Sequence, residues 1–435
     1  MDASSSPSSL PQELIGSILT HLQEDQKTLQ ACSLVCRSWI NPSYTFYFQA
    51  IKIRQAPRLQ EFLADLRSGP VFAPFIRSLS YDGCAPRYRL DSDAVPYDAT
   101  QKLSPHLIGT ILSSLPCLKT IVLHNVILTT PFHYDLASQG TKFALLRLLL
   151  WDCSFIDPLD LVHTLQNFEE IGKLDISGLT SFNHRTAMEK DFSIDIPEMH
   201  RTRVNRLFFD ARCWVSGTRY LNFASPCFLK DQLVPSHLRS LIMALSDKFE
   251  SSLIEPLIVD DLPSLEKFGI DLRPRQQCNL TLDCLHWFER LESLKHLALK
   301  IVLDSDALVA LKTTWSDLFH ILNKLPSNSR TSLRSFKITL KIFGSDTSTQ
   351  VLVPSDWDQL SQCLEMFKAL ERVDFVWEVS LFEREWLERV SPLNPDPYTI
   401  DTLVWVTGPD TISNMMPRLH SRGLLHFSTI ETLFW

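Results

Sequence analysis

The chain has little glycine and no run of apolar residues long enough to cross a membrane. Glycine accounts for only 12 of 435 residues, which disfavours the glycine-rich loops of nucleotide-binding folds. The longest apolar stretch, FALLRLLLW at 143–151, is too short to span a bilayer and contains Arg147. The first nine residues are polar, without the apolar centre of a secretory signal. We therefore expect an intracellular protein, in the cytoplasm, the nucleus or both.

Sequence signatures of catalysis and metal binding are also missing. None of the 10 cysteines forms a C-x-x-C pair, and the nucleophile-elbow, P-loop, dinucleotide and H-E-x-x-H motifs are absent. The formal net charge of −8 disfavours a chain built to wrap nucleic acid. We expect no enzymatic activity, no cofactor, no metal site, and no nucleic-acid or membrane partner.

What the sequence does have is an unusually apolar opening segment, after a flexible tail at 1–9. Pro11 suits the first turn of a helix, and five apolar residues then cover an arc of about 140° on its surface. They are Leu14, Ile15, Ile18, Leu19 and Leu22. Asp25 is a candidate N-cap for a second helix over 27–36, and Asn41-Pro42 predicts the end of the helical segment.

The second predicted helix carries apolar residues on two sides. Leu29 and Cys32 share one side, whereas Leu34 and Val35 lie on the other. A surface helix needs a single apolar stripe, and about 40 residues form too small a core to bury two. One side can pack internally or toward the next domain, and the other requires a second protein.

The same stretch resembles an F-box. The residues that carry the resemblance are LPQELI at 10–15, Ile18, Leu19, Leu22 and SLVCRSW at 33–39, although QKTLQAC replaces the Asp-Leu pair of many F-boxes. The resemblance implies docking on the S-phase kinase-associated adaptor protein and, through it, on a cullin. The implied apolar contacts are Leu10, Pro11, Ile15, Ile18, Leu34, Val35 and Trp39. The alternative is a set of helices that only caps the domain behind it.

Most of the remaining chain repeats the pattern apolar-x-x-apolar-x-apolar. Twelve copies occur 26 to 42 residues apart, starting at Ile76, Leu118, Leu145, Ile171, Val204, Leu238, Leu265, Leu294, Leu333, Leu370, Ile400 and Ile430. Each copy predicts a short strand, often preceded by a helical stretch. The series resembles a leucine-rich-repeat solenoid with a parallel sheet. The usual turn asparagine is replaced, for example by Cys153, so we expect irregular turns.

The predicted fold class is therefore α/β. We expect a disordered tail at 1–9, an F-box at 10–50, a linker helix at 51–70 and an irregular repeat solenoid at 71–435. The x positions of the strands would form a binding surface for a protein substrate, with candidate residues Arg147, Trp151, Lys173, Arg206, Phe208 and Lys267. The alternative is that these charges are only balanced by Asp175, Asp210 and Asp271.

The resemblance implies a substrate-receptor subunit of an SCF-type cullin-RING ubiquitin ligase, similar to the expanded F-box families of mushroom-forming fungi. In this interpretation the repeats bind an unknown protein target, and the chain performs no chemistry. The alternative is a repeat scaffold that binds the adaptor without ubiquitin transfer, or whose N-terminal helices only cap the solenoid.

Overall fold

A computed structural model describes most of the secondary structure of the chain and divides it into two compact units, Met1–Thr202 and Arg203–Trp435. The described residues are 10–23, 25–69, 71–83, 102–129, 142–155, 158–178, 180–181, 201–210, 233–244, 264–272, 288–304, 318–319, 321–343, 354–380 and 409–432. The tail predicted at 1–9 and the repeat copy predicted at 400–405 lie outside them.

The first unit begins with three helices, α1 (Gln12–His21), α2 (Gln26–Ser33) and α3 (Arg37–Tyr47). Asp25 caps α2, as predicted, and its carboxylate accepts a hydrogen bond of 3.1 Å from the Thr28 backbone N–H. The predicted end at Pro42 is wrong, because α3 continues through this residue. Proline removes one backbone hydrogen bond from a helix, and the packing of Phe46 and Tyr47 against the other helices offsets that loss.

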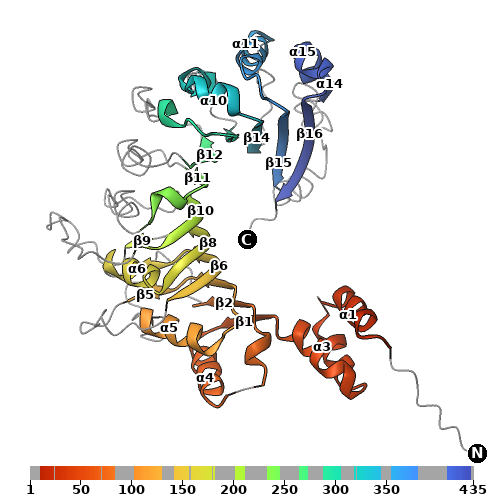
Figure 1. Cartoon of the computed structure of the whole chain (residues 1–435), viewed down its shortest axis with the longest axis vertical. Helices are drawn as coiled ribbons and strands as arrows, with labels where there is room; N and C mark the ends of the chain where they lie inside the picture. Colours follow the sequence, from red (N-terminus) through yellow and green to blue (C-terminus); the bar gives the residue numbers. More distant parts are fainter. Residues whose placement is uncertain are drawn as a thin grey trace, which may run out of the picture. The chain divides into compact units, whose positions relative to one another are not determined.

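Behind these helices the first unit holds a parallel sheet. Its strands, in spatial order, are β1 (Ala50–Arg54), β2 (Ser78–Asp82), β4 (Thr120–His124), β6 (Phe143–Trp151) and β8 (Phe168–Ser177). A second parallel sheet contains β3 (Lys102–Leu103), β5 (Ile127–Leu128), β7 (Ser154–Phe155) and β9 (Thr180–Ser181). The helical elements are α4 (Ala56–Arg67), η1 (Ala73–Phe75), α5 (Pro105–Ser114) and α6 (Pro158–Leu165), and α5 contacts both α4 and α6 (Figure 1).

The second unit is also built on parallel strands that follow the order of the sequence. They are β10 (Arg203–Asp210), β11 (Ser240–Ala244), β12 (Lys267–Leu272), β13 (His296–Asp304), β14 (Ser335–Phe343), β15 (Arg372–Ser380) and β16 (Leu425–Thr432). Its described helices are η6 (Pro235–His237), α10 (Ser327–Ser332), α11 (Pro354–Glu365), α14 (Pro409–Met415) and α15 (Pro417–Ser421). Figure 1 shows α11, α14 and α15 near the ends of β15 and β16.

The repeated pattern encodes the core of both units. In β6 the three apolar positions of the copy are Leu145, Leu148 and Leu150, and all three are buried. The ten copies that start between Ile76 and Leu370 each coincide with a strand whose apolar positions are buried in this way. Because adjacent strands are parallel and in register, each row of apolar side chains stacks on the next.

Two strands differ from the sequence prediction. β1 stands at the start of the stretch predicted as a linker helix, and the helix itself is α4. The segment FQAIKI at 48–53 is a copy of the pattern with an aromatic first residue, which explains its pairing with β2. At the other end, β16 pairs with β15 from Leu425 onward, five residues before the copy predicted at Ile430.

The turns that follow β4, β6 and β8 are alike, although irregular turns were predicted. Each contains one residue with a positive φ, namely Asn125 at 54°, Asp152 at 50° and Gly178 at 73°. The next residue after Asp152 is Cys153, which replaces the expected asparagine. Its buried thiol donates a hydrogen bond of 3.3 Å to the carbonyl oxygen of Leu123. The Cys153 thiol therefore satisfies a backbone carbonyl of the neighbouring strand β4.

Candidate functional site

The three N-terminal helices share a small internal cluster. Ile15 and Leu19 of α1 and Leu29 of α2 are at most 1% exposed, and Trp39 of α3 packs against them. Two of the predicted adaptor contacts therefore point inward. Ile15 does not fit a direct contact with the adaptor, because its side chain is buried among the other helices. Trp39 keeps part of its surface exposed.

Five large apolar side chains of the same segment face solvent instead. Leu14 and Ile18 lie one helical turn apart on α1 and are 51% and 41% exposed. Leu10, just ahead of α1, is 48% exposed, and Pro11 is exposed beside it. Leu14 belongs to the apolar arc expected from the sequence but not to the predicted adaptor contacts. One edge of the arc, which includes Ile15, packs against the other helices, whereas the edge with Leu14 faces solvent.

The turn between α2 and α3 carries the most exposed pair. Leu34 is 82% exposed and Val35 is 66% exposed, because α2 ends at Ser33 and leaves both residues outside the helix. Cys36, which follows them, is the N-cap residue of α3 and is also exposed. A contact of 3.0 Å with the Ser38 hydroxyl lowers the pKa of the Cys36 thiol. The turn therefore presents apolar surface next to a solvent-exposed thiol.

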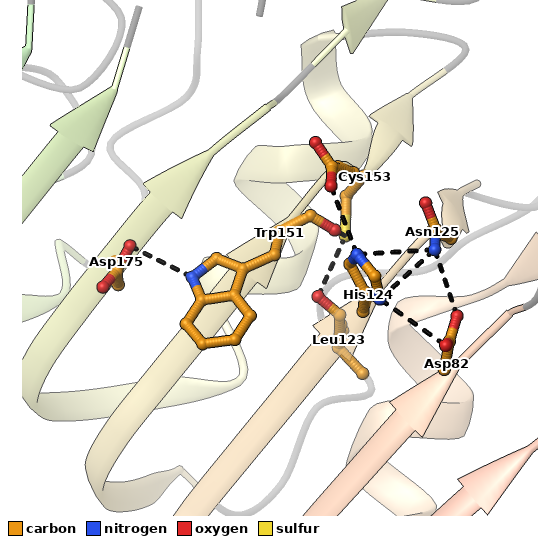
Figure 2. Close-up of polar contacts among 8 residues, drawn as sticks. Asp82, Leu123, His124, Asn125, Trp151, Cys153 and Asp175 are labelled. Atoms are coloured by element: carbon orange, nitrogen blue, oxygen red, sulfur yellow. Dashed lines mark hydrogen bonds and ion pairs between the residues drawn. The ribbon is translucent and has the colours of Figure 1, made fainter. Parts of the chain in front are cut away.

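On the sheet of the first unit, the predicted residues Arg147, Trp151 and Lys173 lie on one face. The register pairs Arg147 with Lys173, and Trp151 follows four residues along β6. Lys173 forms an ion pair of 3.0 Å with Asp175, and the Trp151 indole N–H donates to the same carboxylate at 3.3 Å (Figure 2). Within the described part of the chain no ion pair is found for Arg147, whose side chain is exposed.

Next to Trp151 lies a polar cluster around His124. Its ring is 3.2 Å from Asp152 and 3.6 Å from Asp82, and the Asn125 side-chain amide donates to Asp82 at 3.1 Å. Figure 2 shows the Trp151 indole nitrogen directed toward Asp175 and the His124 ring beside Asn125 and Asp82. The polar groups of this edge satisfy one another. They fix side-chain positions more than they offer free binding capacity.

In the second unit, the predicted residues Arg206, Phe208 and Lys267 also share one face. Arg206 and Lys267 occupy the same row, because both are in register with Ser240 of the intervening strand. Phe208 lies two residues along β10, next to Ile242 of β11, which is 41% exposed. The side chains of Asp210 and Asp271, the alternative charge partners, lie outside what the structure describes. Their backbone positions are four residues, or about 13 Å, along each strand from Arg206 and Lys267.

Two further findings concern the described residues as a whole. They contain no group of three or more His, Cys, Asp or Glu side chains arranged to hold a metal ion. None of their helices is long and apolar enough to cross a membrane.

Comparison with known protein families matches residues 7–41 to the F-box-like family. The matched residues span α1, α2 and the first turn of α3, and they include the exposed apolar residues on α1 and at the α2–α3 turn. Comparison with curated proteins finds no similar protein.

Proposed function

We propose that this chain is a substrate-receptor subunit of an SCF-type cullin-RING ubiquitin ligase. Its N-terminal helices dock on the S-phase kinase-associated adaptor, and the adaptor connects it to a cullin. The observation that carries the proposal is the exposed apolar surface of Leu14, Ile18, Leu34 and Val35 inside the segment that matches the F-box-like family. Exposed apolar side chains concentrated in this way are typical of a protein interface.

The proposed adaptor contacts are the outward-facing members of the predicted set. Leu10, Pro11, Ile18, Leu34 and Val35 belong to it, and the exposed part of Trp39 extends it. Leu14 is added because it lies between Leu10 and Ile18 on the same side of α1. Ile15 would support the surface from within, as part of the cluster that holds α1 against α3.

An aromatic cluster joins these helices to the sheet that follows. The Tyr44 ring at the end of α3 lies 6.4 Å from that of Phe75 in η1, and Phe48 stacks on Phe72 at 5.3 Å. Such ring contacts hold two elements in a defined geometry. In a receptor, this connection would keep the strands of the first unit at a constant orientation to the docked adaptor.

The strands behind the F-box are proposed to form a divergent leucine-rich-repeat scaffold, of the type found in fungal F-box families, that binds a protein target. The chain would then act without chemistry of its own. Holding the target beside the ubiquitin-charged enzyme raises the effective concentration of its lysines at the transfer site. This role needs two binding surfaces and no catalytic group.

The test is co-expression with the adaptor followed by size-exclusion chromatography and a binding titration. Wild type should elute as a complex. The variant Ile18→Asp/Leu34→Asp should bind at least about 100-fold more weakly, since each substitution places a charge in an apolar interface. A matched control is Val71→Asp/Leu146→Asp, which changes two other exposed apolar residues outside the three helices and should bind like wild type.

Two outcomes would contradict the proposal. If wild type and both variants elute free and folded, the helices only cap the domain behind them. If the complex forms but a reconstituted ligase carrying this receptor leaves cellular targets unmodified, the chain is an adaptor-bound scaffold instead.

A further inference from the structure

One row of side chains on the second unit carries only positive or neutral groups. The row starts at Arg206, within β10, and continues through the first residues of β11 to β15, which the register places side by side. Its members are Arg206, Ser240, Lys267, His296, Ser335 and Arg372. Neighbouring strands are about 4.8 Å apart, so Arg206 and Lys267 lie about 10 Å apart.

The adjacent row, one residue earlier in the chain and just ahead of β11 to β15, is different because its charges are paired. Glu266 contacts Lys295 at 3.1 Å and Arg239 at 3.6 Å, and Arg334 lies 3.9 Å from Glu371. The hydrogen bond from Lys295 lowers the pKa of Glu266, which keeps it ionised. Positive charge in this row is therefore largely neutralised by its own neighbours.

In the positive row only Arg372 has such a partner among the described residues, at 2.7 Å from Asp374 on its own strand. No ion pair is found there for Arg206 or Lys267, and both side chains are exposed. The pKa of His296 is lowered, first by burial and then by the nearby positive charge of Lys267. The region around Lys267 thus has an excess of positive charge that nothing described in the chain balances.

An apolar strip runs beside this row, two residues further along the strands. It consists of Phe208, Ile242, Gly269 and Ala298. Gly269 leaves room for Ile242, because a Cβ at this position would stand 3.1 Å from the Ile242 Cγ1 atom. Ile242 therefore leans across the neighbouring strand and still exposes 41% of its surface. A flat apolar patch of this kind beside positive charge is typical of a peptide-binding surface.

We infer that this face binds an acidic segment of a protein partner, with carboxylates at Arg206 and Lys267 and a large apolar side chain on Phe208 and Ile242. Charge complementarity selects the acidic groups, and the strip selects the apolar one. In an extended peptide, residues two positions apart point the same way and are about 7 Å apart. Two such carboxylates are within reach of both cations, because the Arg and Lys side chains are long and flexible.

The identity of this partner as a ubiquitination target rests on the proposed function, whereas the binding surface itself does not. The proposed function and the peptide-binding surface can therefore fail separately. If the chain does not bind the adaptor, the partner is not a ubiquitination target, but peptide binding is unchanged.

The experiment is selection of a random twelve-residue peptide display library on the immobilised full-length chain. The enriched sequences should carry two or more Asp or Glu residues around one Leu, Ile, Phe or Met. By fluorescence anisotropy, Arg206→Glu/Lys267→Glu should bind a selected peptide at least about tenfold more weakly, since reversal places like charges opposite the carboxylates. Ile242→Ser should weaken binding of the same peptide without changing the salt dependence of that binding.

The matched control is Arg58→Glu/Lys119→Glu, which changes the net charge equally at two exposed positions of the first unit and should bind like wild type. Melting curves of all variants verify that they fold. The inference is overturned if no peptide is enriched, if enriched peptides lack acidic residues, or if the charge-reversed variant binds them normally. It is also overturned if a mixed 20-nucleotide single-stranded DNA binds more tightly and is lost in that variant, which would assign the row to phosphates.

Discussion

The N-terminal helices and the repeated strands differ in how many of their apolar residues are buried. Among described residues, α1 to α3 bury three large apolar side chains fully and expose Leu10, Leu14, Ile18, Leu34 and Val35. The strands bury almost every apolar position of the repeated pattern. The difference follows from size, because about 40 residues cannot enclose a core that stacked strands build by repetition. The helices leave residues of their own apolar pattern for a partner to cover, whereas the strands enclose theirs in the core they build together.

The largest expected effect concerns two cysteines, one from each region. Burial raises the pKa of Cys153 to about 12, whereas the pKa of the exposed Cys36 is lowered by its contact with Ser38. Only the thiolate reacts with iodoacetamide. At pH 7.5 we therefore expect Cys36 to be alkylated at least about 1,000-fold faster than Cys153, as measured by peptide mass spectrometry over time.

Adaptor binding should reduce this difference between the two alkylation rates. Cys36 follows the exposed pair Leu34 and Val35, so a partner covering them would slow its alkylation and leave Cys153 unchanged. Denaturation in urea is the control, since both thiols should then react at similar rates. Comparable rates for the two cysteines in the folded chain would show that Cys153 is not enclosed as described.

The second prediction compares core truncations in the two regions. Leu29→Ala and Leu148→Ala each remove a fully buried leucine and should each cost about 2–5 kcal/mol. In the helices this is a large share of the stability that so small a core provides, so hydrogen exchange should rise throughout α1 to α3 while the strands stay protected. Leu148→Ala should instead raise exchange in β4, β6 and β8.

A matched control for the helices is Leu34→Ala. Its side chain is 82% exposed, so the substitution should change stability by less than about 0.5 kcal/mol while weakening adaptor binding. Equal exchange in Leu29→Ala and Leu34→Ala would mean that the cluster does not hold the helices together.

The sequence predicts the repeated strands better than the ends of the sheet. Strands that repeat with three apolar positions were located correctly for the copies from Ile76 to Leu370, because every inward residue is aliphatic or aromatic. β1 was missed because its copy begins at Phe48, directly after the last residue of α3. β16 was missed because Arg422 stands where the pattern needs an apolar residue. The apolar pattern indicates which residues are buried locally, whereas the positions of β1 and β16 also depend on pairing with the neighbouring strand.

The candidate sites were predicted only in part, for a related reason. Helical periodicity placed Ile15 and Ile18 on one apolar arc, but it does not say which edge of the arc meets another helix. Packing against α3 turns Ile15 inward and leaves Leu14 outside. On the strands, period two placed Arg147 and Lys173 on the exposed face. The ion pair of Lys173 with Asp175 is a property of side-chain geometry that spacing alone does not reveal.

The smallest expected effect lies at the start of α2 and concerns the helices alone. Two hydrogen bonds from Thr28, one from its hydroxyl and one from its backbone N–H, lower the pKa of Asp25. A carboxyl group with a lowered pKa in the folded state adds stability above its unfolded pKa and loses it as the pH falls through the folded value. Asp25→Ala should therefore speed hydrogen exchange in α2 at pH 7, and the difference from wild type should become smaller at pH 3, below the ordinary pKa of an aspartate. Thr28→Val removes only the hydroxyl bond and should give a smaller change at pH 7. A difference between Asp25→Ala and wild type that is the same at both pH values would show that the charge of Asp25 does not act as the cap. Because the strands contain no part of this interaction, their exchange should be the same in all three proteins.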